Sequence, residues 1–463
     1  YSLSYAQERL WFIEQYEKGS NAYHMPLLVS LNEGIDIEAI KRSISSIVQR
    51  HEVLRSVFRQ DEEGSDYQVV LNDDLVIREY NYQDTVISKQ IDLDINTPFD
   101  LVNDYPIRVS IYREDDDTKL LINIHHIASD GWSIDILLKE LKAYYDYYTN
   151  NTPIHLPELS IQYKDFAVWQ REYLQGTNLN KQLAYWRDRL LGYETLNMPT
   201  DYPRPAKIDY RGSNVSFDLD EEISTKLRAI AKENNSSLYS LMLSVFYVLL
   251  HKYTGQEDIV IGTPIANRHH IQIQDLIGFF VNSLGLREQI DPSDTIIDLL
   301  KEVHSNLIEV QSHQDLPFEK LVAELNVEQD QSRHPIFQVM FSVQSFGGED
   351  TKLFKPTSDI SYKVAKFDLS CFIDDSQSRL RGLISYATSL YSEESIERLV
   401  ESYKRILQQL VQQKERKIRD YSLLTPQDYQ RIVYDWNATD SDYPNDRTIY
   451  ELFEEQVEKN PNN

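Results

Sequence analysis

Residues 119–145 read KLLINIHHIASDGWSIDILLKELKAYY, and the predicted fold depends on the change from strand to helix within this stretch. Its first eight residues are rich in aliphatic side chains, which is typical of a buried strand. Residues 128–131, Ala-Ser-Asp-Gly, then interrupt the run with turn-forming residues. From Ile134 to Tyr145 apolar residues recur at helical spacing. The stretch therefore predicts a strand, a tight turn and a helix.

A second series of elements begins near residue 214 and has a similar outline. The pattern predicts a strand at 214–219, helices at 221–234 and 238–253, and a strand at 258–262. Because strands and helices alternate along the chain, we expect an α/β architecture. No strict residue-level repeat relates the two series, so a duplicated two-lobe protein is inferred from element order alone.

The composition excludes several classes of protein. The 463 residues include 47 Lys and Arg against 74 Asp and Glu, a formal net charge of −27. We expect no nucleic-acid partner, because nucleic acid requires a dense basic patch. The single cysteine, Cys371, excludes an internal disulfide and a multi-cysteine metal site, and we expect no metal.

Membrane and secretion signals are also missing from the sequence. The longest apolar stretch, Leu238–Leu250, is shorter than the ~20 residues of a spanning helix. The first nine residues lack the order of a signal peptide. We therefore expect a cytoplasmic protein with no membrane contact.

Two adjacent histidines end the first predicted strand. Neighbouring side chains of a strand point to opposite faces, so His125 and His126 cannot readily share a metal ion. Asp130 is spaced to orient a ring or bind an arginine across the turn. A histidine at a strand end is also commonly a hydrogen-bonded structural residue.

Other catalytic templates are missing from the chain. The G-x-S-x-G, P-loop, dinucleotide-binding and H-E-x-x-H motifs do not occur. The leading chemical hypothesis is therefore a histidine-centred group transfer without a bound cofactor.

Residues 125–131 resemble the HHxxxDG motif of nonribosomal peptide synthetase condensation domains, a family related in fold to chloramphenicol acetyltransferase. Six further segments resemble the family's other motifs, in the family's order: residues 4–12, 50–58, 163–169, 277–287, 313–319 and 332–338. Residues 424–453 resemble the junction with an adenylation domain. The chain ends soon after a helix predicted from Thr448, as expected for a cut inside a longer polypeptide.

The resemblance implies an α/β fold of two chloramphenicol-acetyltransferase-like lobes, forming a pseudo-dimeric V with a central tunnel. The N-terminal lobe is assigned to residues 1–175 and the C-terminal lobe to 176–422. Residues 423–463 are assigned to a linker and the beginning of a truncated adenylation domain. Between Trp186 and Gly212, a run with three prolines predicts an exposed connection.

Members of this family join two thioesters carried on the phosphopantetheine arms of carrier proteins. The α-amine of the acceptor aminoacyl group attacks the donor acyl or peptidyl carbonyl, and an amide forms. The resemblance thus implies a peptide-bond-forming acyltransferase of antibiotic biosynthesis that binds no cofactor directly. The implied partners are an upstream donor carrier, a downstream acceptor carrier and the adjoining adenylation domain. We expect a monomer.

The same resemblance assigns roles to individual residues. His126, the second histidine of the motif, is the implied catalytic residue, with general-base and orienting roles both open. Asp130 is implied to pair with a buried arginine, for which we predict Arg287. His125 is expected to support the motif from the opposite strand face, and Gly131 to allow a tight turn with room for a substrate arm.

Three more residues are candidates for lining the substrate tunnel: Trp132, Ser133 and Arg55. For Trp132 and Ser133, packing and helix-start roles are the alternative. For Arg55 the alternative is packing or an ion pair. Backbone N–H groups around Gly131 are candidates for binding the oxyanion.

Three other functions remain open at this point. An epimerization domain would deprotonate an α-carbon, but the SRHPIFQ segment at 332–338 and the HHIASDGWS segment at 125–133 favour condensation. A cyclization domain replaces both motif histidines with aspartate, whereas His125 and His126 are present. A scaffold that only docks carriers would keep the fold without turnover, and only an activity measurement decides that case.

Overall fold

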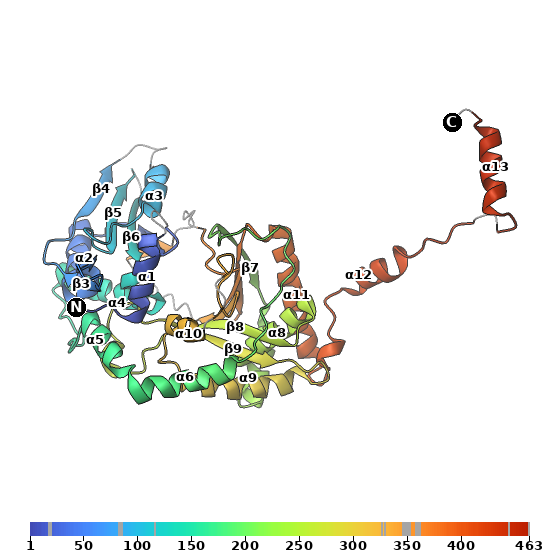
Figure 1. Ribbon diagram of the computed structural model, residues 1–463. Helices are drawn as coiled ribbons and strands as arrows, with labels where there is room; N and C mark the ends of the chain where they lie inside the picture. The colour runs from blue at the N-terminus through green and yellow to red at the C-terminus, as the bar shows by residue number, and fades with distance from the viewer. Residues whose placement is uncertain are drawn as a thin grey trace. The chain divides into compact units, whose positions relative to one another are not determined.

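The computed structural model describes residues 1–16, 21–81, 87–114, 117–325, 327, 330–344, 353–356, 363–442 and 445–461. The chain forms two compact units, Tyr1–Tyr421 and Ser422–Asn463. The larger unit contains a mixed sheet of five strands and a mixed sheet of six (Figure 1). The α/β class predicted from the sequence is confirmed.

The first sheet has the strand order β11-β1-β6-β5-β4. Its strands are β1 (His24–Leu31), β4 (Ile77–Asn81), β5 (Ile107–Arg113), β6 (Thr118–His125) and β11 (Phe354–Pro356). The helices of this half are α1 (Tyr5–Tyr16), α2 (Ile37–Arg50), α3 (Ile87–Asn96), α4 (Gly131–Asn150) and α5 (Tyr163–Tyr173), and a hairpin pairs β2 (Ser56–Gln60) with β3 (Asp66–Val70).

The alternation of side chains along β6 divides the first half into two layers. Ile122 and Ile124 belong to the large core cluster that includes the apolar faces of α2 and α4. Leu121, on the other face, packs with Ile91 and Ile95 of α3. Asn123 follows that second face, because its side-chain amide donates to the Ile95 carbonyl at 3.2 Å. The period-2 pattern predicted for this strand is therefore present.

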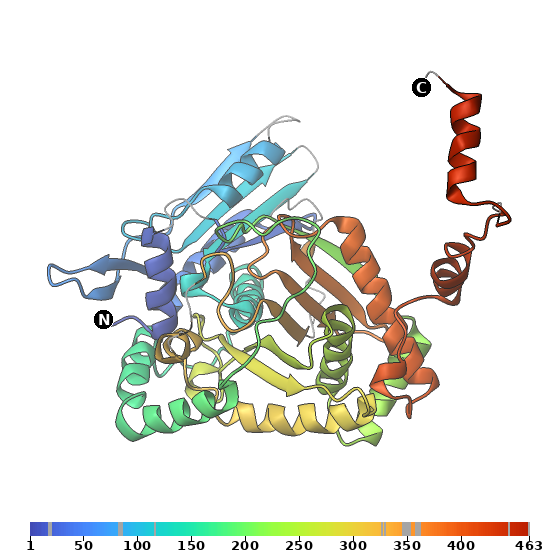
Figure 2. The ribbon, with the colours of Figure 1, turned by 45° about the vertical axis from the view of Figure 1, so that its right-hand side comes forward.

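The second sheet has the order β7-β13-β12-β10-β8-β9. Its strands are β7 (Gly212–Asp218), β8 (Asp258–Ile265), β9 (Asn282–Gln289), β10 (Val339–Gln344), β12 (Leu369–Asp374) and β13 (Arg381–Ala387). The helices are α6 (Gly176–Leu190), α7 (Glu221–Glu233), α8 (Leu238–Thr254), α9 (Ile296–Gln311), α10 (Phe318–Leu325) and α11 (Glu393–Gln412). The orange α11 lies along the second sheet (Figure 2).

The long apolar stretch of the sequence becomes the central helix of this half. Residues 240–250 of α8 are all buried, and α8 packs against α7, α9, α11 and the strand β10. A helix that is apolar on every side is expected where neighbours surround it. Within the described ranges, no helix is long and apolar enough to span a membrane.

Element boundaries agree with the sequence to within a few residues, and the differences have local causes. The first predicted helix begins at Gly131, three residues early, because Asp130 caps it by accepting the Ser133 N–H at 2.9 Å. The preceding strand ends at His125, and His126 begins a 3₁₀ turn, η2 (His126–Ala128). The second series appears as β7, α7, α8 and β8.

The smaller unit contains α12 (Pro426–Gln430), a π-helical turn at Arg431–Asp435 and α13 (Ile449–Lys459). Capping boxes begin both helices, with Thr425 paired to Asp428 and Thr448 to Glu451. None of these three helical segments has a buried residue. The unit therefore has no core of its own among its described residues.

Segments from the second half of the sequence complete the first half. The predicted lobe boundary at 175/176 falls between α5 and α6. Beyond it, Ile273, Leu276, Ile277 and Phe280 nevertheless belong to the core cluster of the first half. The short strand β11 also pairs with β1, opposite residues 29–31. The two halves are therefore interlocked.

A buried ion pair between Asp130 and Arg268 holds the loop that carries residues 273–280 against the first half. Both side chains are 2 % exposed, and Arg268 Nη2 donates to Asp130 Oδ1 at 3.0 Å. Asp130 Oδ2 also accepts the backbone N–H of Phe280 at 3.0 Å. Arg268 Nη1 donates to the carbonyls of Ile273 and Leu276 at 2.7 and 2.6 Å. The pair thus joins the start of α4 to the loop between β8 and β9.

The prediction that Arg287 is the partner of Asp130 is wrong. Arg287 lies on β9, opposite Val260 of β8, and therefore diagonal to Asp258. Its Nε and Nη2 donate to the two oxygens of Asp258 at 2.8 and 2.7 Å. This cross-strand carboxylate is nearer than Asp130, so the buried position is taken by Arg268, which follows a left-handed residue, Asn267 (φ 51°).

The ion pair generates a stability prediction. We expect Asp130→Ala to lower the free energy of unfolding by about 3–5 kcal/mol, because the Arg268 charge is then buried without a partner. Urea unfolding of the single variants and of Asp130→Ala/Arg268→Met measures the effect. The double variant should lose less than the sum of the two single losses.

Arg287→Met provides the matched control for this cycle. Combined with Asp130→Ala, it should give additive losses, because Arg287 contacts a different carboxylate. Additivity of Asp130→Ala with Arg268→Met, or coupling of Asp130→Ala with Arg287→Met, would contradict the assignment.

Candidate active site

His126 lies at the point where β6 ends and the chain turns. Its backbone N–H donates to the Tyr23 carbonyl at 2.8 Å. Its ring Nδ1 is 2.9 Å from the Ser129 carbonyl oxygen. Because a carbonyl only accepts, Nδ1 carries the hydrogen in this contact and Nε2 carries the lone pair. The turn therefore presents one defined tautomer of the imidazole.

The surroundings of His126 favour its neutral form. Burial, followed by the positive charge of Lys366 and the neighbouring His125, holds the pKa of His126 well below its usual range. At neutral pH the ring is therefore uncharged and can accept a proton at Nε2. A hydrogen bond between Nδ1 and a backbone carbonyl is the arrangement that orients an imidazole for this purpose.

The side chain of His125 lies on the other face of the strand, where contacts with the protein occupy both of its ring nitrogens. Its Nδ1 accepts the Ile127 N–H at 3.1 Å, and its Nε2 lies 3.2 Å from Glu14 Oε1. The side chain is 1 % exposed and stands edge-on to Phe99. Burial lowers the pKa of His125, while Glu14 opposes that effect. Both ring nitrogens are therefore used in structural contacts.

The loop between β8 and β9, residues 266–281 and here called the crossing loop, places an aromatic side chain beside His126. The Phe279 ring stands edge-on to His126, with centroids 5.1 Å apart. Its carbonyl accepts the Tyr163 hydroxyl at 2.7 Å, and the next residue, Phe280, is bound to Asp130. The position of the Phe279 ring beside His126 is therefore set by the interlocking of the two halves.

Gly131 and Trp132 lie at the first turn of α4. Gly131 is the first helical residue, and a Cβ built there would meet nothing within 4 Å. Its φ is not among the left-handed ones, so the tight turn predicted for it is not what requires glycine. Trp132 is 50 % exposed, and its indole N–H donates to the Gln274 carbonyl at 3.1 Å.

Two predicted tunnel residues have structural roles instead. Ser133 is fully buried, where its hydroxyl donates to Asp130 at 2.7 Å and accepts from Arg268 at 2.8 Å. Arg55 is 8 % exposed and donates to the Leu71 carbonyl and the Asn72 side chain. Both predictions are corrected, because buried hydrogen bonds occupy these side chains.

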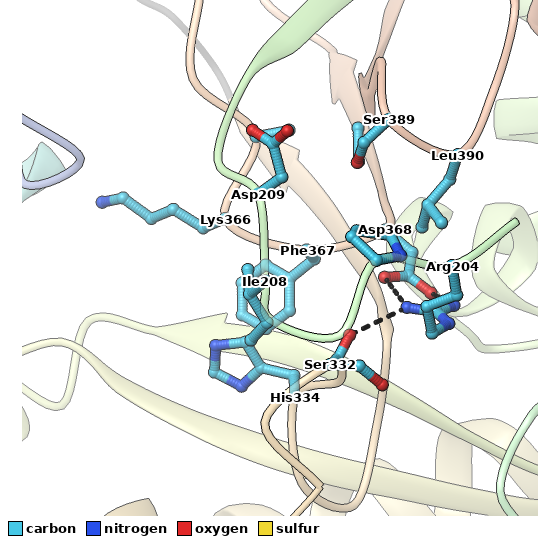
Figure 3. Close-up of a pocket in the computed structure, with 13 residues that line it drawn as sticks. Arg204, Ile208, Asp209, Ser332, His334, Lys366, Phe367, Asp368, Ser389 and Leu390 are labelled. Atoms are coloured by element: carbon cyan, nitrogen blue, oxygen red, sulfur yellow. Dashed lines mark hydrogen bonds and ion pairs between the residues drawn. The ribbon is translucent and has the colours of Figure 1, made fainter. Parts of the chain in front are cut away.

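Sequence reasoning missed three residues of this region: Arg268, which pairs with Asp130, Phe279, which packs on His126, and Lys366, whose charge acts on His126. Phe279 lies within a motif quoted above but had no assigned role, and Arg268 and Lys366 lie outside the motifs. Lys366 also lines a pocket with His334 and the Arg204–Asp368 ion pair (Figure 3). Within the described ranges, no cluster of three or more His, Cys, Asp or Glu side chains could hold a metal ion.

Comparisons with known proteins identify the family of this chain. A family model described as the condensation domain matches residues 1–433. Gramicidin S synthase 2 of Brevibacillus brevis is 36 % identical over 468 residues, which cover 100 % of this chain and 10 % of that protein. Malpinin synthetase of Mortierella alpina is 34 % identical over 469 residues, covering 99 % and 6 %. The chain thus spans a tenth or less of the length of these two relatives.

Solved structures share the fold. The X-domain from teicoplanin biosynthesis superposes with a TM-score of 0.82 at 24 % identity, covering 91 % of this chain and 97 % of that one. A four-domain nonribosomal peptide synthetase bound to AMP and glycine gives a TM-score of 0.84 at 22 % identity, covering 100 % and 36 %. At these identities the likeness concerns the fold alone. Since the family model spans nearly the whole chain and the relatives exceed 30 % identity, this chain belongs to the condensation domain family.

Proposed function

We propose that this condensation domain forms an amide bond between a donor acyl or peptidyl thioester and the α-amine of an acceptor aminoacyl thioester. The observation that carries the proposal is the placement of His126, whose Nδ1 lies 2.9 Å from the Ser129 carbonyl oxygen, so that Nε2 keeps its lone pair. The lowered pKa of this buried ring favours the same form. The relatives named as synthases of gramicidin, plipastatin and surfactin support the same reaction.

The reaction needs no nucleophile from the protein. The amine nitrogen attacks the thioester carbon, a C–N bond forms, and the carbonyl oxygen takes the negative charge. His126 Nε2 accepts the proton that the nitrogen loses. The C–S bond then breaks, and the departing thiolate takes that proton from the imidazolium. Holding two activated substrates together supplies much of the rate enhancement.

Two carrier proteins are the proposed partners, one upstream with the donor and one downstream with the acceptor. Each would bring its substrate on a phosphopantetheine arm, so this domain need not hold a cofactor. We assign residues 423–463 to the linker and the start of an adenylation domain in a longer synthetase. The two interlocked halves correspond to chloramphenicol-acetyltransferase-like lobes, and we expect the domain to act as a monomer in the cytoplasm.

The first activity prediction concerns His126. We expect His126→Ala to slow amide formation by about 10²–10⁴-fold, the usual contribution of a positioned acid or base. The measurement is single-turnover transfer of a donor from one loaded carrier to the aminoacyl group of a second, followed by intact mass. His155→Ala, at an exposed histidine, is the matched control and should keep the native rate.

The outcomes of this experiment separate the alternatives. Thermal unfolding of both variants shows whether the fold is retained. A native chain that is inert with several loaded carrier pairs would support a scaffold that only docks carriers. A folded His126→Ala variant at the native rate would assign the reaction to positioning alone.

The pH dependence follows from the lowered pKa of His126. That histidine stays neutral above its own pKa and is lost as a base only when pH falls through it, below about 6.5. From pH 6.5 upward the logarithm of the single-turnover rate should therefore rise with a slope of one. It should level near pH 8, where the acceptor amine loses its proton (pKa about 7.7–8.0).

Rates measured between pH 5.5 and 9 test this prediction. As the pH is lowered, the slope of the logarithm of the rate could change from one to two at pH 6.5 or above. Such a change would show that His126 titrates with an ordinary or raised pKa. That result would contradict the neutral form proposed for the resting enzyme.

A further inference from the structure

The side chain of Lys366 reaches from the second half of the chain to Tyr23, a residue that adjoins both motif histidines. It precedes β12 of the second sheet, yet its Nζ lies 5.1 Å from the centre of the Tyr23 ring, beside β1 of the first sheet. The Tyr23 carbonyl accepts the backbone N–H of His126. The Tyr23 ring also lies 6.5 Å from the ring of His125. The Lys366 ammonium therefore lies beside Tyr23, which contacts the backbone of His126 and lies near the ring of His125.

The acidic residues around Lys366 are engaged elsewhere. Asp368, two residues along, accepts Arg204 at 3.0 Å, and Asp209 on the facing segment accepts Arg211 at the same distance. In Figure 3 the Lys366 side chain extends away from the Arg204–Asp368 pair. Among the residues that the structure describes, no carboxylate lies within ion-pair distance of its amine.

The charged groups of α1 also have other contacts. On α1, Arg9 donates to Glu319 at 2.7 Å, and Glu14 contacts His125. Burial and the charge of Arg9 lower the pKa of Lys366 to about 8, so most of the amine is protonated at pH 7. A partly buried cation without a counter-charge costs stability, and such groups are concentrated at functional sites.

We propose that Lys366 is a positioning residue for His126, holding the imidazole in the neutral form that accepts the proton of the attacking amine. The inference rests on the proposed condensation reaction. It also accounts for the second proton movement. Once Nε2 is protonated, the charge of Lys366 repels the imidazolium, which therefore readily gives its proton to the thiolate as the C–S bond breaks.

The titratable and charged groups that face His126 come from several elements. His125 precedes it on β6. Glu14 of α1 contacts His125, and the charge of Arg9, also on α1, acts on Lys366 and His334. The crossing loop contributes the uncharged Phe279. Lys366 acts on both histidines and lowers the pKa of each, and for His126 its charge ranks directly after burial. Removal of this one charge should therefore be visible in the titration of His126.

The test compares Lys366→Met, which removes the charge, with Lys366→Arg, which keeps it. The full chain is labelled with ¹³C-histidine, and NMR follows the His126 resonance, assigned by its loss in His126→Ala, from pH 4 to 8. We expect the pKa of His126 to rise in Lys366→Met and to stay near the native value in Lys366→Arg. Because burial still lowers the pKa of His126 in Lys366→Met, the single-turnover rate at pH 8 should match the native rate. The steeper fall of the rate at low pH should begin at a higher pH in the methionine variant only.

Lys363→Met, at an exposed lysine three residues earlier, is the matched control and should change neither readout. The inference is overturned if His126 titrates alike in native and Lys366→Met, whatever the rates. It is also overturned if the methionine and arginine variants raise the pKa equally. A native chain that transfers no acyl group while Lys366→Met still shifts the titration would refute the proposed function and support the Lys366–His126 coupling.

Discussion

The pairing of Asp130 with Arg268 is the constraint on which the rest of the site depends. Two unit charges are removed from water, a cost that only a close and fully hydrogen-bonded arrangement offsets. The carboxylate meets Arg268, Ser133 and the Phe280 N–H, and the guanidinium meets two backbone carbonyls of the crossing loop. The same contacts fix the first turn of α4 and the loop that carries Phe279. The Asp130–Arg268 pair therefore positions both the first turn of α4 and the loop that places Phe279 beside His126.

The proposed chemistry depends on how the start of α4 and its surroundings set the tautomer and the pKa of His126. The Ser129 carbonyl that holds Nδ1 of His126 belongs to the residue directly before Asp130, so the cap of α4 also fixes the tautomer. Burial and a nearby cation lower the pKa of His126 and make it a weak base. A weak base is sufficient, because the proposed nucleophile is an amine that titrates near about 8 and is already partly neutral in the cell.

Local features of the fold could be predicted from the sequence, because their causes are local. The strand β6, the turn that follows it and the apolar helix α8 each depend on residues within a short stretch of sequence. The candidate catalytic histidine, His126, could be identified because it lies in a contiguous motif. The partner of Asp130 could not, because it lies 138 residues away in a loop without periodicity. Arg287 lies at the end of a quoted motif, but it pairs with Asp258 on the adjacent strand.

The same limit applies to the exchange of segments between the halves. The cores of both halves are apolar, so composition cannot say that residues near 273–280 pack against the first sheet. Lys366 is the extreme case, because its sequence neighbours Phe367 and Asp368 belong to a pocket of the second half, while its amine lies against Tyr23. Its significance depends on the absence of a carboxylate among the described residues around it, which no sequence pattern reveals.

The two adjacent histidines show how backbone geometry separates structural from reactive chemistry. Both are the same residue type, both are at the end of β6, and both have lowered pKa values. His125 remains in the strand, and contacts with Ile127 and Glu14 occupy its two nitrogens. His126 starts the turn, and the turn's own carbonyl takes only Nδ1. The end of the strand between them therefore decides which ring keeps a nitrogen lone pair that these contacts do not use.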